Sequence, residues 1–466
     1  MKRRHFLKSS AMGTLAGSSA FSASAQAAAP YNDEILIHIF LRGGIDGLNV
    51  VVPLGDHDHE YYSIMRPVLA IPDSGANGAI ALGSTEFGLN PKAAALKDLY
   101  DAGHLAIVHA VGTPNPIATR SHFDAEKYIE LGTPGLVGTT SGWLHRHFIA
   151  MSGVLEQYPD EIFMPIVALR NNPPVSLLGN TSVLTVSSPA SFKLDNAHWR
   201  WDVEDPTWPE KGYLQLDMLP EIYALANDEI SYSGNQALAA EFILRTNYDK
   251  DYTGSGSNVY QNNRIANQLK DIAQVIKMDL GTRTFTLDYG GWDTHTGQSN
   301  PDSFDNPLES LSNAIAAFMD DINSSGGSYA DRTTVIVQSE FGRRMYENNS
   351  QGTDYGNGNI MLIIGKQVNG GQVYGNWPGL YPGREDGWVE YDNPKNGSPE
   401  PELFEGALSS TTDFRRILSE YLQKRGRHTS PTLELIFPGY SGYTPMGIFN
   451  TLAVPGDAIF DSGFED

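Results

Sequence analysis

Residues Leu287–Gln298 read LDYGGWDTHTGQ, and this stretch indicates the fold class of the chain. From Thr284 to Tyr289, β-branched and aromatic residues alternate along the chain, which is typical of a half-buried β-strand. Two glycines end this strand, and Asp293 and His295 follow at once. Parallel α/β sheets bind their ligands beyond the carboxyl ends of the strands. The stretch therefore predicts an α/β fold with a carboxylate and an imidazole at its functional edge.

Asp and His supply oxygen and nitrogen donors to divalent metals, although an isolated pair of this kind more often caps a turn and packs. The same placement recurs at two other strand ends. The apolar run Glu34–Leu41 precedes Asp46, which lies among glycines, and Thr333–Val337 precedes Glu340. Asp46 also fits a tight turn in which its side chain accepts local backbone hydrogen bonds. The recurrence favours a metal site.

Further elements complete the α/β pattern, with apolar runs of strand length alternating with residues at helical spacing. The expected strands are Leu105–Val111, Phe163–Leu169 and Ile360–Ile364, and the expected helices are Pro91–Ala102, Asn263–Leu280 and Leu308–Ile322. The run Asp56–Glu60 is rich in metal-type ligands, but alternate residues of an extended segment point to opposite sides. We expect a solvated loop there.

Ser121 begins a helix after the strand Leu105–Val111 and an irregular loop. A hydroxyl at this position is a candidate nucleophile, because the helix N-terminus stabilises developing negative charge. It is equally a candidate N-cap, with Asp124 or Glu126 completing the first turn. The sequence leaves both interpretations open.

The composition is that of a globular protein: among 466 residues, 40% are hydrophobic, 19% are charged and none is cysteine. The formal charge of −23 disfavours nucleic-acid binding, because such a surface repels phosphate backbones. An anionic substrate stays compatible with this charge, because a bound metal inverts the local field.

The first 29 residues contain KRRHFLK and a short, mildly apolar run, and resemble a twin-arginine export signal. The run is too short to span a membrane, so we expect a periplasmic or secreted bacterial protein that uses the twin-arginine machinery. Residues 30–450 are expected to form one domain, with a cap or insertion near 152–257, and 451–466 an acidic tail. Tryptophans crowd 199–209 within the cap, where carbohydrate binding is a weaker alternative.

Five ordered motifs, LRGGIDGLN, SHFDAE, LDYGGWDTH, SEFGRR and GTDYGNG, resemble the secreted bacterial proteins grouped as domain of unknown function 1501 (DUF1501). The resemblance covers about Ile35–Tyr440. That family is placed with the alkaline phosphatase and sulfatase superfamily. The resemblance therefore implies a three-layer αβα fold with a mostly parallel central sheet, and a site for divalent metals at the strand ends.

The resemblance also implies roles for single residues. Asp46 would be the metal ligand of the first strand, Asp293 and His295 would bind one metal, and Glu340 would take the place of a second-metal aspartate. Ser121 would attack phosphorus or sulfur, with Thr119 as a less favoured substitute. Arg120 or Arg343 would hold the oxygens of the anion through a bidentate fork.

Two positions depart from the pattern. Phe341 follows the last acid where alkaline phosphatases have a histidine, and Tyr355 replaces the histidine of the family's usual GTDHG. A phenol with a pKa near 10 is a poor zinc ligand at neutral pH. One calcium or magnesium ion, bound through the oxygens of Asp46, Asp293, Glu340 and Asp354, is then easier to build than a two-zinc site.

Two functions follow from these residues. The first is a metal-dependent hydrolase that acts on small or polymer-linked phosphate or sulfate esters and uses zinc, calcium or magnesium. The alternative is a pseudoenzyme that binds or assembles components of the cell envelope.

Overall fold

The computed structural model describes residues 34–151, 164–179, 183–192, 215–225, 229–324, 329–380 and 406–451. The expected export signal, the tryptophan-rich stretch 199–209 and the tail after residue 451 lie outside these ranges. Within them, no helix is both long and apolar enough to cross a membrane.

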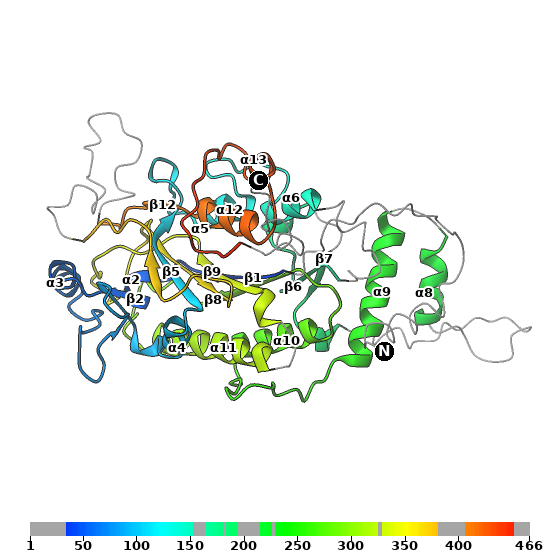
Figure 1. Cartoon of the computed structure of the whole chain (residues 1–466), viewed down its shortest axis with the longest axis horizontal. Helices are drawn as coiled ribbons and strands as arrows, with labels where there is room; N and C mark the ends of the chain where they lie inside the picture. Colours follow the sequence, from blue (N-terminus) through cyan, green and yellow to red (C-terminus); the bar gives the residue numbers. More distant parts are fainter. Residues whose placement is uncertain are drawn as a thin grey trace, which may run out of the picture.

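A central sheet organises the described part of the chain, with the strand order β11-β5-β10-β9-β1-β8-β6-β7 and with β12 beside β5 (Figure 1). The strands are β1 (Ile35–Arg42), β5 (Leu105–Gly112), β6 (Ile166–Leu169), β7 (Val183–Val186), β8 (Thr284–Gly290), β9 (Thr333–Ser339), β10 (Asn359–Ile364), β11 (Gln372–Tyr374) and β12 (Thr412–Asp413). Only β10 runs antiparallel to its neighbours among these strands. The predicted mostly parallel α/β sheet is confirmed.

Strand β1 lies at the middle of the sheet, between β8 and β9, with Ile39 opposite Leu287 on one side and Val337 on the other. Every residue of β1 except Arg42 is buried. Helices cover both faces of the sheet, which explains why this strand reads as a continuous apolar run rather than an alternating one.

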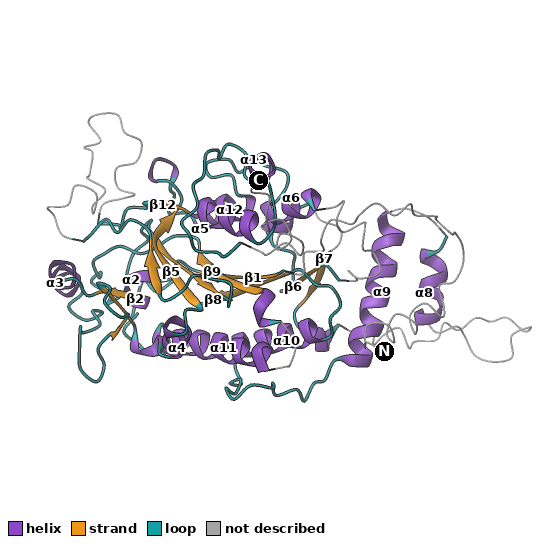
Figure 2. Ribbon diagram, viewed as in Figure 1, coloured by secondary structure: helices purple, strands orange, loops and turns teal. Residues whose placement is uncertain are grey.

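The helices form two layers (Figure 2). One face of the sheet packs against α4 (Ala95–Asp101), α10 (Arg264–Lys277) and α11 (Asp305–Ser324). The opposite face packs against α5 (His122–Leu131), α6 (Trp143–Ala150), α12 (Phe414–Lys424) and α13 (Ser430–Ile436). Each layer has its own apolar core, so the predicted three-layer arrangement is confirmed.

Smaller elements lie around this framework. A second sheet joins β2 (Val51–Pro53), β4 (Phe87–Leu89) and β3 (Ile80–Ala81), beside α2 (Gly47–Val50). Short 3₁₀ turns span Pro91–Ala93, Asn115–Ile117, Val175–Leu177, Pro189–Ser191 and Ala330–Arg332. The expected cap region supplies β6 and β7 to the central sheet and also contains α8 (Gln215–Tyr223) and α9 (Glu229–Asn247), which pack together at the β7 end.

The expectation of a loop at Asp56–Glu60 is wrong, because these residues begin α3 (Asp56–Met65). Asp58 is buried, and its carboxylate accepts hydrogen bonds from Trp377 Nε1 and from the backbone nitrogen of Leu380, each at 2.7 Å. These tertiary contacts, which local spacing does not reveal, give the charged run its helical conformation.

His38 of β1 makes the stability of the fold depend on pH. Burial lowers its pKa to about 4. Below pH 6.5 an unfolded chain gains a proton at this position and the folded chain does not, so stability falls as the pH drops from 6.5 towards 4. Between pH 7 and pH 5, the free energy of unfolding should fall in both proteins. We expect the fall to be roughly 1–2 kcal/mol smaller in His38→Leu than in the unsubstituted chain. Urea titrations at both pH values measure this, and equal losses would contradict it.

Candidate metal centre

Polar side chains converge at the carboxyl edge of the sheet. Gly43 follows β1, Asp293 follows β8 and Glu340 follows β9. Because β10 is antiparallel, its first residue lies at the same edge, and the glycine loop that precedes it brings Tyr355 to this place. Gly43 has a φ of 119°, and a Cβ there would lie 2.5 Å from the backbone nitrogen of Asp293. Glycine is therefore required at this close approach.

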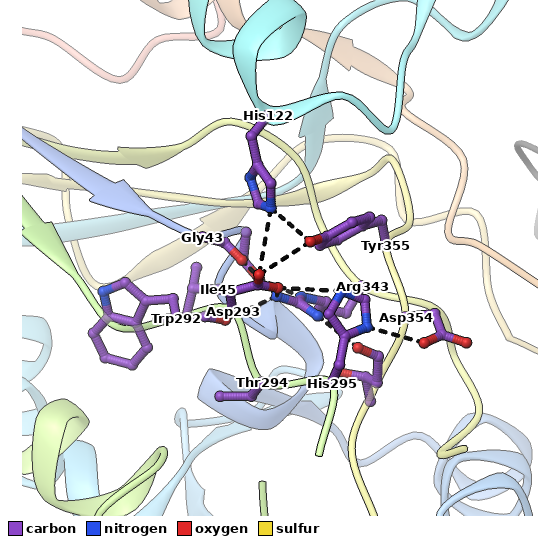
Figure 3. Close-up of polar contacts among 12 residues, drawn as sticks. Gly43, Ile45, His122, Trp292, Asp293, Thr294, His295, Arg343, Asp354 and Tyr355 are labelled. Atoms are coloured by element: carbon purple, nitrogen blue, oxygen red, sulfur yellow. Dashed lines mark hydrogen bonds and ion pairs between the residues drawn. The ribbon is translucent and has the colours of Figure 1, made fainter. Parts of the chain in front are cut away.

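The carboxylate of Asp293 lies at the centre of the cluster (Figure 3). His295 Nε2 lies 3.2 Å from its Oδ1, and His122 Nε2 lies 3.8 Å from its Oδ2. The hydroxyl of Tyr355 donates to Oδ2 at 3.1 Å and lies 2.7 Å from His122 Nε2. The Asp293 side chain is 49% exposed, so the cluster opens to solvent.

A second carboxylate fixes each imidazole. Nδ1 of His122 lies 2.7 Å from Glu340 Oε1, and Nδ1 of His295 lies 3.0 Å from Asp354 Oδ1. Because an ionised carboxylate only accepts hydrogen bonds, each Nδ1 carries a proton and each Nε2 is directed towards Asp293. This pairing of carboxylate and histidine is the arrangement that orients histidine ligands in metal sites.

Hydrogen bonds and burial shift the pKa values of three groups in this cluster. The hydrogen bond with Glu340 raises the pKa of His122. Burial raises the pKa of Glu340, but hydrogen bonds from His122, Gly43 and Ser339 outweigh it and the pKa is lowered. In Asp293 the same balance, with Arg343 and Tyr355 as donors, also lowers the pKa.

Tyr355 is a neutral phenol in this setting. Burial and the hydrogen bond to Asp293 raise its pKa to about 12. Its ring stacks edge-on against His295 and His122, with centroids 4.3 and 4.6 Å apart. Tyr355 thus lies between the two imidazoles.

Several donor atoms of the cluster lie close to their neighbours. Donors bound at about 2.1 Å lie roughly 3.0–3.5 Å from one another, and the distances among His122 Nε2, Tyr355 Oη, Asp293 and His295 Nε2 fall near this range. His122, Glu126 and Glu340 also place ligand atoms within 4.8 Å of one another.

In that second group the carboxylates are already bound. Glu126 Oε2 pairs with Arg42 at 2.6 Å, and Glu340 Oε1 accepts from the backbone nitrogen of Gly43. A metal ion bound by this group would therefore compete with Arg42 and with the backbone of Gly43.

Asp46 has a different environment from the one predicted. It is fully buried, and its two oxygens accept hydrogen bonds from Arg66 at 2.6 and 3.1 Å, while Gln298 donates to Oδ2 at 2.6 Å. The assignment of Asp46 as a metal ligand stays a prediction, and in this structure its carboxylate neutralises a buried arginine.

Arg343 also differs from the prediction. Its guanidinium is fully buried and donates to the carbonyl oxygens of Gly44 at 2.6 Å, Thr353 at 2.5 Å and Trp292 at 2.9 Å, and to Asp293 at 3.0 Å. These bonds use its donors within the protein, so they leave it unsuited to hold the oxygens of a substrate.

Ser121 is the N-cap of α5, and its Oγ accepts from the backbone nitrogen of Asp124 at 3.4 Å. The N-cap interpretation is thus confirmed for its geometry, and the same geometry places the hydroxyl directly before His122. Arg120 precedes it and is half-buried. Its role in holding an anion stays a prediction.

Sequence reasoning missed His122 and the part played by Tyr355. His122 lies within the SHFDAE motif, but attention to acids directly after strands favoured its neighbour Ser121. A rule that also considered the first helical residue after a strand would have found it.

Removing the carboxylate of Asp46 should destabilise the fold. In Asp46→Ala, Arg66 keeps a buried charge without its partner, which costs about 3–5 kcal/mol of the free energy of unfolding. Denaturant titration measures the loss. A variant with unchanged stability that no longer binds metal would instead support the original assignment of Asp46 as a ligand.

Known proteins place these residues in a wider context. A family model described as Protein of unknown function (DUF1501) matches residues 179–392, which include three of the five motifs. A search of curated proteins finds no match.

Solved structures show weak likenesses, each with a TM-score of 0.30 and 10% identity. They include the C-terminal periplasmic domain of EptC from Escherichia coli in complex with zinc, covering 72% of this chain and 74% of that one. An alkaline phosphatase superfamily protein from Vibrio parahaemolyticus covers 80% and 70%, and the PsFucS1 sulfatase from Pseudoalteromonas sp. covers 80% and 68%. The family match confirms, over residues 179–392, the resemblance of this chain to DUF1501.

Proposed function

We propose that this protein is an exported, metal-dependent hydrolase of phosphate or sulfate esters. The observation that carries the proposal is the convergence of His122 Nε2, His295 Nε2 and the Asp293 carboxylate, with each imidazole oriented by a second carboxylate. Export to the periplasm or beyond rests on the twin-arginine pattern of residues 2–8.

His122, His295 and Asp293 would hold the metal, with Tyr355 as a fourth donor. Glu340 and Asp354 would not bind the metal directly. They would accept hydrogen bonds from the two imidazoles and so orient them. Two nitrogen donors favour zinc over calcium or magnesium, which prefer all-oxygen sites. A bound zinc ion supplies a Lewis acid that neutralises charge on the ester and lowers the pKa of a coordinated hydroxyl.

The residues of the chain supply the remaining chemistry. Ser121 Oγ would attack phosphorus or sulfur, and the bond to the leaving alcohol would break. The N-terminus of α5 favours negative charge at this oxygen. Arg120 would hold the non-bridging oxygens, since Arg343 is committed to backbone carbonyls. Hydrolysis of the serine ester by water would complete the cycle.

A second candidate is the pseudoenzyme, a binding or assembly protein of the cell envelope. The observation that favours it is the Tyr355 hydroxyl, which bridges His122 and Asp293 as a neutral phenol. Metal content separates the two candidates. The proposed hydrolase needs the metal ion, whereas a pseudoenzyme in which the Tyr355 hydroxyl bridges His122 and Asp293 does not.

We expect the protein purified without chelators to contain about one zinc per chain, and His122→Ala/His295→Ala to contain none. Mass spectrometry of the metal measures both. His57→Ala is the matched control, because His57 is exposed on α3, and it should keep its zinc. Metal retained in the double variant would refute this ligand set, and metal absent from every protein would favour the pseudoenzyme.

Ser121→Ala should lower kcat on phosphate or sulfate esters by roughly 10³-fold or more while leaving the metal content unchanged. Thr119→Val is the comparison, because Thr119 is the alternative hydroxyl and its Oγ1 accepts from the backbone nitrogen of Ser121. Steady-state kinetics with nitrophenyl esters measures both variants. Full activity in Ser121→Ala would exclude Ser121 as the nucleophile, and no activity in the zinc-loaded parent would exclude hydrolysis of these esters.

A further inference from the structure

The described residues line an open cavity of about 750 Å³ at the carboxyl edge of the sheet, and none of these lining residues belongs to the Asp293 cluster. Leu169 and Arg170 line it at the end of β6, Ser187 and Ser188 at the end of β7, and Asp288 near the end of β8. The first half of α10 forms another wall. Strand ends of this kind are the usual place for ligands in open α/β sheets.

Three cationic side chains line the cavity, although the protein carries a formal charge of −23. Arg170, Arg264 and Lys270 line it, beside Asp271 and Asp288. Both of these acids are already engaged within the protein, Asp288 with Arg170 at 3.0 Å and Asp271 with two hydroxyl groups at 2.5 and 2.8 Å. Asp288 and Glu130, the latter at 3.8 Å, offset the charge of Arg170. Arg264 and Lys270 together outweigh Asp271, and this remaining positive charge favours an anionic ligand.

The uncharged part of the lining is made of amides and hydroxyls. Asn171, Asn172, Asn267 and Gln268 provide amides, and Leu169 is the only aliphatic residue in the described part of the lining. Gln268 donates through Nε2 to the carbonyl of Leu169 at 3.0 Å, and its Oε1 has no hydrogen-bond partner among the described residues. An apolar ligand would leave these groups unpaired at a cost, whereas the hydroxyls of a sugar can both donate and accept.

Ion pairs connect the cavity with the metal centre. Asp288 contacts both Arg170 of the cavity and Arg42, at 3.0 and 3.2 Å, and Arg42 contacts Glu126 at 2.6 Å. Glu126 in turn places a carboxylate oxygen within 4.8 Å of a ring nitrogen of His122. The cavity and the proposed site of ester cleavage therefore share one polar edge of the sheet.

We propose that the cavity binds the saccharide part of the substrate, so that the substrate class is an acidic carbohydrate. Arg264 and Lys270 would pair with its acidic groups, and the amides would bond to its hydroxyls. The position of the scissile ester rests on the proposed function, but saccharide binding at the cavity does not require hydrolysis.

The test is calorimetric binding to the full mature chain after removal of metal with EDTA, which prevents turnover. The probes are a chondroitin 4-sulfate tetrasaccharide, neutral chitotetraose and inorganic sulfate. The cavity variant is Arg264→Ala/Lys270→Ala. The matched control is Lys92→Ala/Lys97→Ala, which removes the same charge from two residues whose partners, Glu309 and Asp101, lie outside the cavity.

We expect the sulfated tetrasaccharide to bind at least ~10-fold more tightly than either other probe, and the cavity variant to weaken it by ~10-fold or more, because charge-assisted hydrogen bonds are lost. The control should change it less than ~2-fold. No binding of the tetrasaccharide, equal binding of sulfate alone or equal loss in the control would each overturn the proposal.

Failure of the cavity proposal and failure of the proposed function give different results. Tetrasaccharide binding without cleavage of any ester would leave the cavity assignment standing and exclude the hydrolase. Cleavage of nitrophenyl esters without tetrasaccharide binding would support the hydrolase and exclude saccharide binding at the cavity.

Discussion

The buried guanidinium of Arg343 is the interaction on which the candidate site depends. It joins carbonyl oxygens from the end of β1, from the segment after β8 and from the glycine loop, and it also contacts Asp293. A guanidinium offers five N–H donors in a rigid fork, so one side chain can serve several carbonyl oxygens at once. Without it, several buried carbonyls would lose their donors, and the three segments that carry the cluster would lose their common anchor.

Much of the fold could be predicted from the sequence because helices cover both faces of the sheet. Burial on both faces makes β1, β5 and β9 continuous apolar runs, and the strong helical spacing of α10 and α11 identifies the covering layer. The helix α3 was missed because its sequence is charged. Its position depends on contacts between Asp58 and the distant residues Trp377 and Leu380, which no local pattern contains.

The site was predicted less completely than the fold. Placing acids at strand ends correctly located Asp293 and Glu340 at one edge, but it treated every such acid as equivalent. Asp46 differs because Arg66, 20 residues further along the chain, enters the same buried space. Pairing of this kind depends on side-chain positions in three dimensions, so composition and spacing cannot separate a ligand from the partner of a buried arginine.

The reversed direction of β10 divides the site into two parts with different folding requirements. Gly342 and Arg344 pair with the segment Asp354–Asn357 through backbone hydrogen bonds, so the turn that carries Glu340 and Tyr355 closes over a short stretch of chain. His122 and Asp293 reach that turn only after long connections have closed, which costs more chain entropy and slows assembly. The segment between β9 and β10 can thus form through local contacts, and His122 and Asp293 then complete the site.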